Sequence, residues 1–460
     1  MNHREIFHIN KRSFLTITLV LGILMVLSMI LIFIVPQGVI EEGAYIPVHQ
    51  PVSIFKLIAS PILVLFSEGN LTIIMISVFI LILAGSFNII DKTGGIESIL
   101  QYFIRRFEKK KMLLMHLVVL LFMSFGAFFG VFEEAVTLLP MIVLLSLSLG
   151  WDTFTGTGMC LLAAGFGFSS AITNPFSVGL GSQAMGLSIV EGIGLRIITF
   201  IIMYGILCLF LRNHIRKIEK DPTRSPTYAI DCEKRKNLTF SSESNPRTFR
   251  IYAIFFIILF LIIILSSVIP LIQGYSIPFI ALAFLVGGLC CGSLINHSFK
   301  ETLLIFFKGL KSMAPAIILI LMASSIRYIL EEGLIIGTII HVTSGFLTTM
   351  TPFSSIIFIY LLILFIQFFI GSASAKIPLL IPILSQLAIE IGITKNIALL
   401  AFIFGDGFTD LIYPTNPVLL IGIGLAGIGY GTWFKKTWFL QLVVFVVTCL
   451  ILLVAFLTHY

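Results

Sequence analysis

Charged residues are scarce in this sequence of 460 residues: Asp, Glu, Lys and Arg together make up 11%. Soluble globular proteins carry about 25% charged residues. The polar surface available here could not cover a chain that is 58% hydrophobic. This scarcity excludes a soluble protein of several domains and indicates a polytopic membrane protein.

Several motifs that mark enzymes and pumps are missing. The sequence has no GxxxxGK[ST] phosphate-binding loop, so ATP is not expected to drive the protein directly. It has no HExxH or GxSxG pattern, so we expect neither an enzyme nor a metal or cofactor. The six cysteines form no CxxC pair and are expected to be inert thiols.

The formal net charge of +7 comes from basic residues that gather in loops between apolar runs, for example between Arg212 and Arg250. Such clusters are typical of cytoplasmic loops in membrane proteins, so we expect no nucleic-acid partner. The first apolar run, Phe14 to Val35, is too long for a signal peptide and follows basic residues. We therefore predict a multi-pass protein whose N-terminus is cytoplasmic.

The apolar runs predict an all-α membrane protein with about nine full spans. A first half (residues 1–212) is followed by a basic cytoplasmic linker (213–250) and a second half (251–460). Each half contains runs that are too short to cross alone, which is typical of discontinuous helices in transporters. They predict one re-entrant helical hairpin and one broken helix in each half: hairpins at 112–149 and 353–391, and broken helices at 154–190 and 397–430.

The two halves also show an internal repeat. The tripeptide Thr-Asn-Pro at Thr173 recurs at Thr415, which is 242 positions later. Other residues that end or interrupt apolar runs recur at the same separation: Pro140 and Pro382, Gly150 and Gly392, and Gly165 and Gly407. When basic loops are placed in the cytoplasm, the two hairpins enter from opposite faces, so the repeats are inverted. We assign this inversion to an additional crossing at residues 277–295.

The two Thr-Asn-Pro sequences predict breaks in membrane helices. Proline frees backbone carbonyls, which protein, water or a ligand must then satisfy. The break residues, namely Thr173, Asn174, Pro175, Thr415 and Asn416, are therefore candidates for binding substrate or ion, with Na⁺ at the two Asn residues. The alternative for each is a proline kink with a capping Asn.

Charged residues near the hairpin tips are the other candidates, because acids within a membrane are costly and usually functional. Glu133 and Glu134 lie at the first tip, and Ser372, Ser374 and Lys376 lie at the second. The acids can instead be solvated at the far surface, and Lys376 can instead form a salt bridge with one of the two glutamates. Asp406 and Asp410 precede the second break at a spacing that places both on one helix face.

These residues also carry a family resemblance. The stretches GAFFGVFEEAVTLLP … SSAITNPFSVGLGSQAMGL and GSASAKIPLLIPIL … FGDGFTDLIYPTNPVLLIGIGLAGIG resemble the YfcC family. That family is grouped with the DcuC-like anaerobic dicarboxylate carriers in the ion transporter superfamily. The resemblance implies a secondary transporter with a scaffold and a moving transport domain. Some relatives exchange arginine for ornithine and others are assigned to dicarboxylates.

We therefore expect an elevator-like secondary transporter of the bacterial cytoplasmic membrane. Four candidate acids and one candidate base favour a small basic or zwitterionic amino acid, moved by exchange or coupled to Na⁺ or H⁺. The alternative is a carrier of four-carbon dicarboxylates or other organic anions. A channel or an intramembrane enzyme is less compatible with the sequence, and a homodimer is compatible with it.

Overall fold

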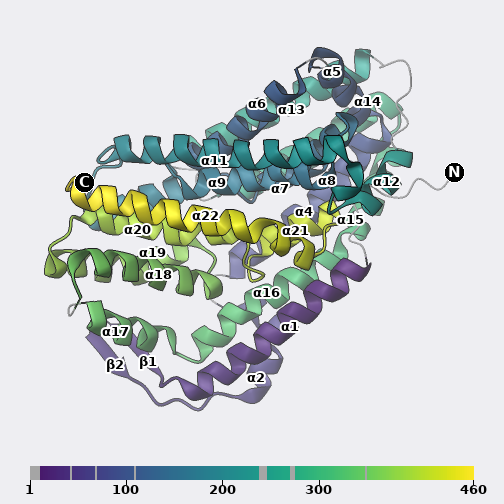
Figure 1. Ribbon diagram of the computed structural model, residues 1–460. Coiled ribbons are helices and arrows are strands. Elements are labelled where there is room, and N and C mark those ends of the chain that lie inside the picture. Colours follow the sequence, from purple (N-terminus) through teal and green to yellow (C-terminus); the bar gives the residue numbers. More distant parts are fainter. Residues whose placement is uncertain are drawn as a thin grey trace.

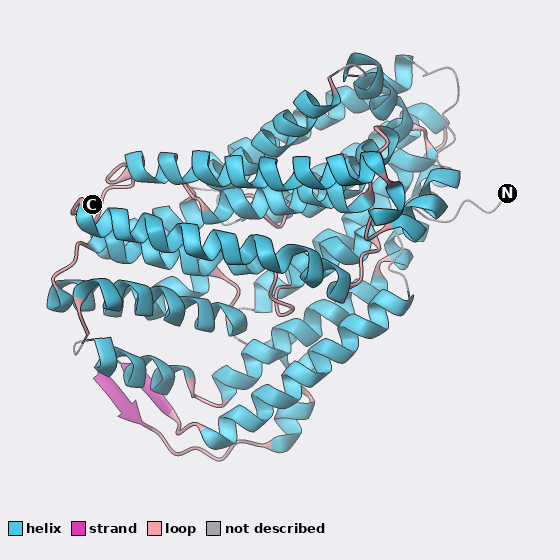
Figure 2. Ribbon diagram, viewed as in Figure 1, coloured by secondary structure: helices cyan, strands magenta, loops and turns pink. Residues whose placement is uncertain are grey.

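The computed structural model describes residues 11–41, 44–67, 70–107, 110–237, 246–269, 275–347 and 350–460. These residues form an all-helical polytopic membrane protein, with one short β-hairpin as the exception to the predicted all-α fold (Figures 1 and 2). Nine helical segments within the described ranges are long and apolar enough to cross a membrane: Ile17–Ile34, Ile73–Lys92, Lys111–Phe129, Ile193–Lys220, Pro246–Ile263, Ile277–Asn296, Phe299–Glu332, Pro352–Phe369 and Tyr430–Leu457.

This number agrees with the predicted one, but the set of segments differs. Lys111–Phe129 and Pro352–Phe369 have the length and composition of spans, although the sequence places them in hairpins. The predicted broken helices are absent from the set, because each is divided into pieces shorter than a span. Length and composition alone therefore do not distinguish the arm of a hairpin from a complete crossing.

In the first half, the helices that follow residue 110 occur in a fixed order. They are α6 (Lys111–Ser124), the π-helix η2 (Phe125–Phe129), α7 (Ala135–Ser148), α8 (Thr153–Thr157), the π-helix η3 (Gly158–Leu162), α9 (Ala163–Ser169), the π-helix η4 (Pro175–Gly179), α10 (Leu180–Met185) and α11 (Ile193–Lys220).

The second half repeats this order. Its helices are α18 (Pro352–Phe369), α19 (Ala373–Ile391), α20 (Lys395–Gly407), the 3₁₀ turn η7 (Phe408–Leu411), α21 (Pro417–Ala426) and α22 (Tyr430–Leu457). The internal repeat therefore extends from four sequence matches to a whole series of helices.

Local capping contacts recur at the same separation of 242 residues. The side chain of Asp152 accepts a hydrogen bond from Thr155 N before α8, and that of Thr394 accepts one from Ile397 N before α20. Gly150 and Gly392, two residues before these caps, both have a left-handed backbone, with φ of 90° and 78°. Because side-chain caps and left-handed glycines fix where helices start and end, the same signals divide both halves in the same way.

Helices α11 and α22 lie side by side and run in opposite directions (Figure 1). At one end Tyr460, just beyond α22, donates a hydrogen bond from its hydroxyl to Gly192 O, just before α11, at 2.6 Å. At the other end the ring of Phe154 packs against His214 near the end of α11 and Trp433 near the start of α22. These two long helices close the two matching series of helices, and they run antiparallel to each other.

The remaining helices lie outside these two series. They are α1 (Lys11–Ile34), α2 (Ile54–Ile58), α3 (Ser60–Leu63), η1 (Val64–Phe66), α4 (Asn70–Lys92), α5 (Gly95–Phe107), α13 (Pro246–Val268), α14 (Ser276–Asn296), α15 (Phe299–Ser312), α16 (Ala314–Glu332) and α17 (Ile336–Leu347), with the hairpin β1 (Gly38–Glu41) and β2 (Ala44–Pro47).

Their packing also occurs in matched pairs. Helix α1 packs against α16 as α14 packs against α4, and α3 packs against α16 as α15 packs against α4. Strand β1 lies on α17, whereas α13 lies on α5. By these contacts α14 is the counterpart of α1. Helix α13 lies on α5 where a strand, β1, lies on α17, so α13 has no helical counterpart. In the inverted arrangement that the sequence predicts, these contacts favour α13 over residues 277–295 as the additional crossing.

The predicted linker at 213–250 is largely ordered where the structure describes it. Helix α11 continues to Lys220, and the 3₁₀ turn η5 (Pro222–Arg224) and α12 (Tyr228–Asn237) follow it. The side chain of Ser225 is buried and donates a hydrogen bond to Asp152 Oδ2 at 2.8 Å. This part of the linker thus packs on the repeated units, because its polar side chains bind the loop that precedes α8.

Candidate functional site

The first turn of α19 places a buried lysine against the end of α20. Lys376 Nζ and Asp406 Oδ1 form an ion pair at 2.5 Å, and the two side chains are 0% and 1% exposed. Neither oxygen of Asp406 receives a well-directed hydrogen bond from a described residue. A buried charge pair that lacks further hydrogen bonds is poorly compensated, so both groups can still bind a ligand.

Asp410 lies in the 3₁₀ turn η7, beyond the end of α20. The sequence spacing predicts Asp406 and Asp410 on one face of a single helix, and that prediction is wrong because α20 ends at Gly407. The two carboxylates are nevertheless close enough to repel each other, and Lys376 attracts both. The turn therefore keeps the two acids around one cation.

Two amides hold Asp410 in place. Gln367 Nε2 and Asn416 Nδ2 donate hydrogen bonds to Asp410 Oδ1 at 2.6 Å and 2.5 Å. Gln367 is buried in α18 and had no signal in the sequence, because it stands alone in an apolar run. We refer to Lys376, Asp406, Asp410, Gln367 and Asn416 as the Lys376 cluster.

Asn416 has all its polar atoms engaged. Its Oδ1 accepts hydrogen bonds from Val418 N at 2.8 Å and Leu419 N at 3.2 Å, so the side chain caps α21. Its Nδ2 is committed to Asp410. At the second break, therefore, the Asn both caps a helix, as the alternative interpretation holds, and orients a carboxylate.

Asn174 at the first break is different. It is fully buried and its Oδ1 accepts a hydrogen bond from Phe176 N at 2.9 Å, but its Nδ2 has no partner among the described residues. Pro175 follows as the first residue of η4, and the half-buried Thr173 donates from its hydroxyl to Phe128 O at 3.2 Å. A buried amide donor without a partner is costly, so this group is available to a ligand.

The first hairpin tip is hydrogen-bonded to the break at residues 173–175. The backbone N–H groups of Ile172, Thr173 and Asn174 all point to Ala127 O, at 2.9 to 3.1 Å. Gly130, whose φ is 70°, lies so close to Asn174 that an added Cβ would be 2.5 Å from Oδ1. Only glycine fits this left-handed position without strain. The tip and the break thus form one packed unit.

The other predicted residues divide between this unit and the cluster. Glu133 is half-buried within electrostatic range of Asp406, whereas Glu134 is buried at the start of α7. Lys376 pairs with Asp406, so the proposed salt bridge from Lys376 to a glutamate is not formed. Ser372 and Thr415 are half-buried at the second tip and break, and the side chain of Ser374 lies outside the described residues.

The two breaks therefore differ in charge although they share a backbone pattern. At the separation of 242 residues, Asp406, Asp410 and Lys376 correspond to Ala164, Phe168 and Glu134. The second break carries two acids and a lysine, whereas the first break offers the amide of Asn174 and has its acids, Glu133 and Glu134, on the adjoining hairpin tip. A ligand between the two breaks would meet a lysine on one side only.

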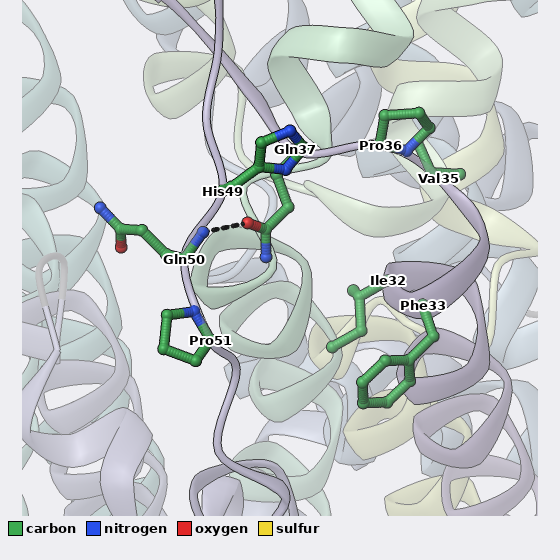
Figure 3. A pocket seen from close by; sticks show the side chains of 8 residues that line it. All are labelled: Ile32, Phe33, Val35, Pro36, Gln37, His49, Gln50 and Pro51. Carbon is green, nitrogen blue, oxygen red and sulfur yellow. Dashed lines mark hydrogen bonds between the residues drawn. The ribbon is translucent and has the colours of Figure 1, made fainter.

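A shallow open pocket lies elsewhere, at the C-terminal end of α1 (Figure 3). Ile32, Val35 and Pro36 line it together with the segment that carries Gln50, whose N–H donates to Gln37 Oε1 at 2.7 Å. It contains none of the predicted site residues and no charged side chain, so it does not change the assignment of the site.

Comparison with known proteins gives consistent matches over most of the chain. Residues 14–457 match the family described as "C4-dicarboxylate anaerobic carrier", DcuC. A protein of Escherichia coli K12 named "Putative basic amino acid antiporter YfcC" is 27% identical over 376 residues, which cover 79% of this chain and 74% of that protein. An uncharacterized protein of Haemophilus influenzae is 27% identical over 405 residues, 87% of this chain and 79% of that one.

Among solved structures, the YdaH transporter of Alcanivorax borkumensis, whose structure is described as having an unusual topology, is similar with a TM-score of 0.47. The sequences are 16% identical, and the similarity covers 95% of this chain and 98% of that one.

Proposed function

The chain belongs to the DcuC family of C4-dicarboxylate anaerobic carriers, and we propose that it carries a small basic or zwitterionic amino acid, by exchange or by coupling to Na⁺ or H⁺. It is a multi-pass secondary transporter and not an enzyme. The observation that carries the choice of substrate is the charge of the Lys376 cluster. Lys376 is the cation that acts on both Asp406 and Asp410, and Glu133 adds a third acid within range.

The excess of acids favours a ligand that brings a positive charge. With Asp406 neutralised by Lys376, Asp410 and Glu133 have no cation of their own among these groups. A bound ammonium or guanidinium would compensate them, and the α-carboxylate of the same ligand would reach Lys376 or the free amide of Asn174. The name of the E. coli relative also refers to basic amino acids as substrates.

A carrier of four-carbon dicarboxylates is the second candidate. The description of the family names such substrates, and one observation favours them: the fully buried Lys376 contacts a single carboxylate oxygen. A substrate carboxylate could replace Asp406 as its partner, particularly if a coupling proton or Na⁺ neutralised the acids. Protonation of Asp410 or cation binding near Asn174 and Asn416 would serve that purpose.

We further propose that the repeats are inverted and that the two hairpins are re-entrant. The opposite directions of α11 and α22 support this arrangement, since both helices are long enough to cross the membrane. The unit of hairpins, broken helices, α11 and α22 would then move as an elevator against the outer helices. Under this proposal the protein resides in a bacterial cytoplasmic membrane with its N-terminus inside, and the outer helices would provide the surface of a homodimer.

Counterflow in proteoliposomes tests the choice of substrate. Vesicles loaded with unlabelled lysine, arginine, ornithine, succinate or fumarate are diluted into the corresponding labelled compound, with and without Na⁺ and pH gradients. We expect accumulation with a basic amino acid and not with a dicarboxylate. Accumulation of the dicarboxylates alone would replace the first candidate with the second.

A further inference from the structure

The two half-helices that follow the breaks end in the same way. Helix α10 ends at Met185 before Gly186, and α21 ends at Ala426 before Gly427. Both glycines are left-handed, with φ of 71° and 76°. The last carbonyls of a helix have no partner within it, and a cation near them is favourable. The capping turns bind earlier carbonyls of each helix, so the last ones, Met185 O and Ala426 O, are left to accept hydrogen bonds from other elements.

In one half, that partner comes from the neighbouring broken helix. Lys395 is the first residue of α20, directly after the capping Thr394, and its Nζ donates a hydrogen bond to Met185 O at 2.9 Å. Thus the start of α20 holds the end of α10. The contact joins the two repeated units, since the two helices belong to different halves of the chain.

The equivalent position in the other half has no lysine. Thr153, which is 242 residues before Lys395, is the first residue of α8 and follows the capping Asp152. The missing ammonium is supplied from the linker. Lys234 on α12 places its Nζ 2.6 Å from Ala426 O and 3.4 Å from Thr153 Oγ1. The same contact is therefore made at both ends of the unit, once from the repeat and once from the linker.

The surrounding contacts of α12 are consistent with this role. Asp231 Oδ1 accepts a hydrogen bond from Thr153 N at 3.0 Å, and Arg235 donates to Trp151 O at 2.6 Å. These bonds place α12 directly over the start of α8. Burial lowers the pKa of Lys234 to about 8, so at pH 7 the amine is still mostly protonated and donates as an ammonium.

We propose that Lys234 and Lys395 are positioning residues that make equivalent contacts and fix the far ends of α21 and α10. Helix α21 has 10 residues, so it is a stiff rod of about 15 Å. Its near end carries Asn416, which holds Asp410. A shift at Ala426 is therefore transmitted to the Lys376 cluster, and helix α12 of the linker acts as part of the transport unit. The effect on transport rests on the proposed function, whereas the effect on α21 does not.

Hydrogen–deuterium exchange on the purified full-length protein tests the structural part without any substrate. In Lys234→Ala we expect the amides of residues 424–428 to exchange about three- to fivefold faster, with α10 unchanged. Lys395→Ala should have the reciprocal effect on α10 only. Lys234→Arg should behave like the wild type, and so should Lys236→Ala, which removes an exposed cation from the same helix.

The double variant Lys234→Ala with Thr153→Lys is the sharpest test, because it moves the ammonium to the position that Lys395 occupies in the other half. We expect normal exchange at α21 to return. If lysine at the buried Thr153 position prevents folding, the proposal is tested by the single variants Lys234→Ala and Lys395→Ala, which should loosen α21 and α10 respectively. Unchanged exchange at α21 in Lys234→Ala, or equal loosening of α10 and α21 in both single variants, would overturn the proposal.

Transport of whichever substrate the counterflow assay identifies gives the second readout. Lys234→Ala should raise KM about threefold or more with Vmax within about twofold, since the geometry of the site changes while the protein stays folded. The arginine variant should restore KM. Altered exchange without any transported substrate would refute only the proposed function, whereas an unchanged KM with active protein would refute the role in positioning.

Discussion

The rings of Phe166 and Phe408 meet edge to face, with their centroids 5.7 Å apart. They are 242 residues apart, so each ring contacts its own counterpart in the other half. The neighbouring contacts are reciprocal as well: Gly165 packs on Leu411, and Gly407 packs on Ser169. A residue that contacts its own counterpart lies close to a two-fold axis. In the inverted arrangement proposed above, the two-fold axis that relates the two halves passes between α9 and the end of α20, beside Asp406.

The close contact between α9 and the end of α20 predicts that alanine is tolerated differently at two glycines. A Cβ on Gly407 would lie 2.5 Å from Ser169 Oγ and 2.7 Å from Ser169 Cα. Because the Cα cannot rotate away, we expect Gly407→Ala to destabilise the protein by about 1–3 kcal/mol. Gly205→Ala in α11, where nothing lies within 4 Å, is the control and should be neutral or slightly stabilising. Thermal unfolding in detergent measures the stability of both variants. Equal unfolding midpoints would contradict the close contact between Gly407 and Ser169.

The buried ion pair predicts that stability and transport can be separated. Lys376→Met leaves Asp406 charged without its partner, which we expect to cost about 3–5 kcal/mol. Adding Asp406→Asn removes the stranded charge and should recover most of the unfolding temperature. Transport should remain lost in the double variant, because both of the groups that we propose to bind the ligand are absent. Recovered counterflow would show that the pair is only structural.

A substitution at Glu133 distinguishes a carrier of basic amino acids from a carrier of dicarboxylates. If it compensates a cation on the ligand, Glu133→Gln should weaken uptake of a basic amino acid by about tenfold or more, since an uncompensated charge in a partly dry site is costly. A dicarboxylate carrier should instead tolerate this variant and lose activity in Lys376→Met. Competition by unlabelled substrates in proteoliposomes measures both affinities. Normal affinity for the amino acid in Glu133→Gln would remove this acid from the site.

The two break asparagines should fail in different ways. Asn416→Ala removes a cap and a hydrogen bond to Asp410, so it should lower the unfolding temperature, with a cost of about 2–3 kcal/mol. Asn174→Ala removes one capping bond and an amide donor that has no partner in the part of the chain that the structure describes, so its effect should fall mainly on substrate affinity. Thermal unfolding and KM, measured on the same preparations, test this. The reverse order would assign ligand binding to the second break.

The local signals of the predicted repeat reappear in the backbone. Glycine, proline and capping residues act within a few positions, so Gly150 and Gly392 or Asn174 and Asn416 show the same backbone pattern in sequence and structure. The partner of Lys376 could not be predicted in this way. Asp406 lies 30 residues away, and whether it or a glutamate is reached depends on how α19 packs on α20.

Two other features had no sequence signal. Gln367 is a single polar residue in an apolar run, and only its packing against Asp410 identifies it. The sequence analysis identifies the linker only as a basic cytoplasmic segment. Its docking depends on Asp152 and Asp231, whose partners lie 62 to 78 residues away along the chain.

The contacts of Asp152 with the linker predict how the stability of the protein depends on pH. Burial alone would raise the pKa of Asp152, but the hydrogen bond and charge of His214 and the hydrogen bonds from Thr155 hold this pKa below its ordinary value. A carboxyl whose pKa is lowered by folding adds stability above its ordinary pKa, and that stability is lost as the pH falls through the lowered value. Asp152→Asn keeps the cap but loses the charge. We expect its unfolding temperature to lie below that of the wild type at about pH 5, and the margin to close as the pH falls below about pH 4. A margin that widens as the pH falls from about 5 to about 3 would mean that the folded protein raises this pKa, and that the contacts of Asp152 do not stabilise its charge.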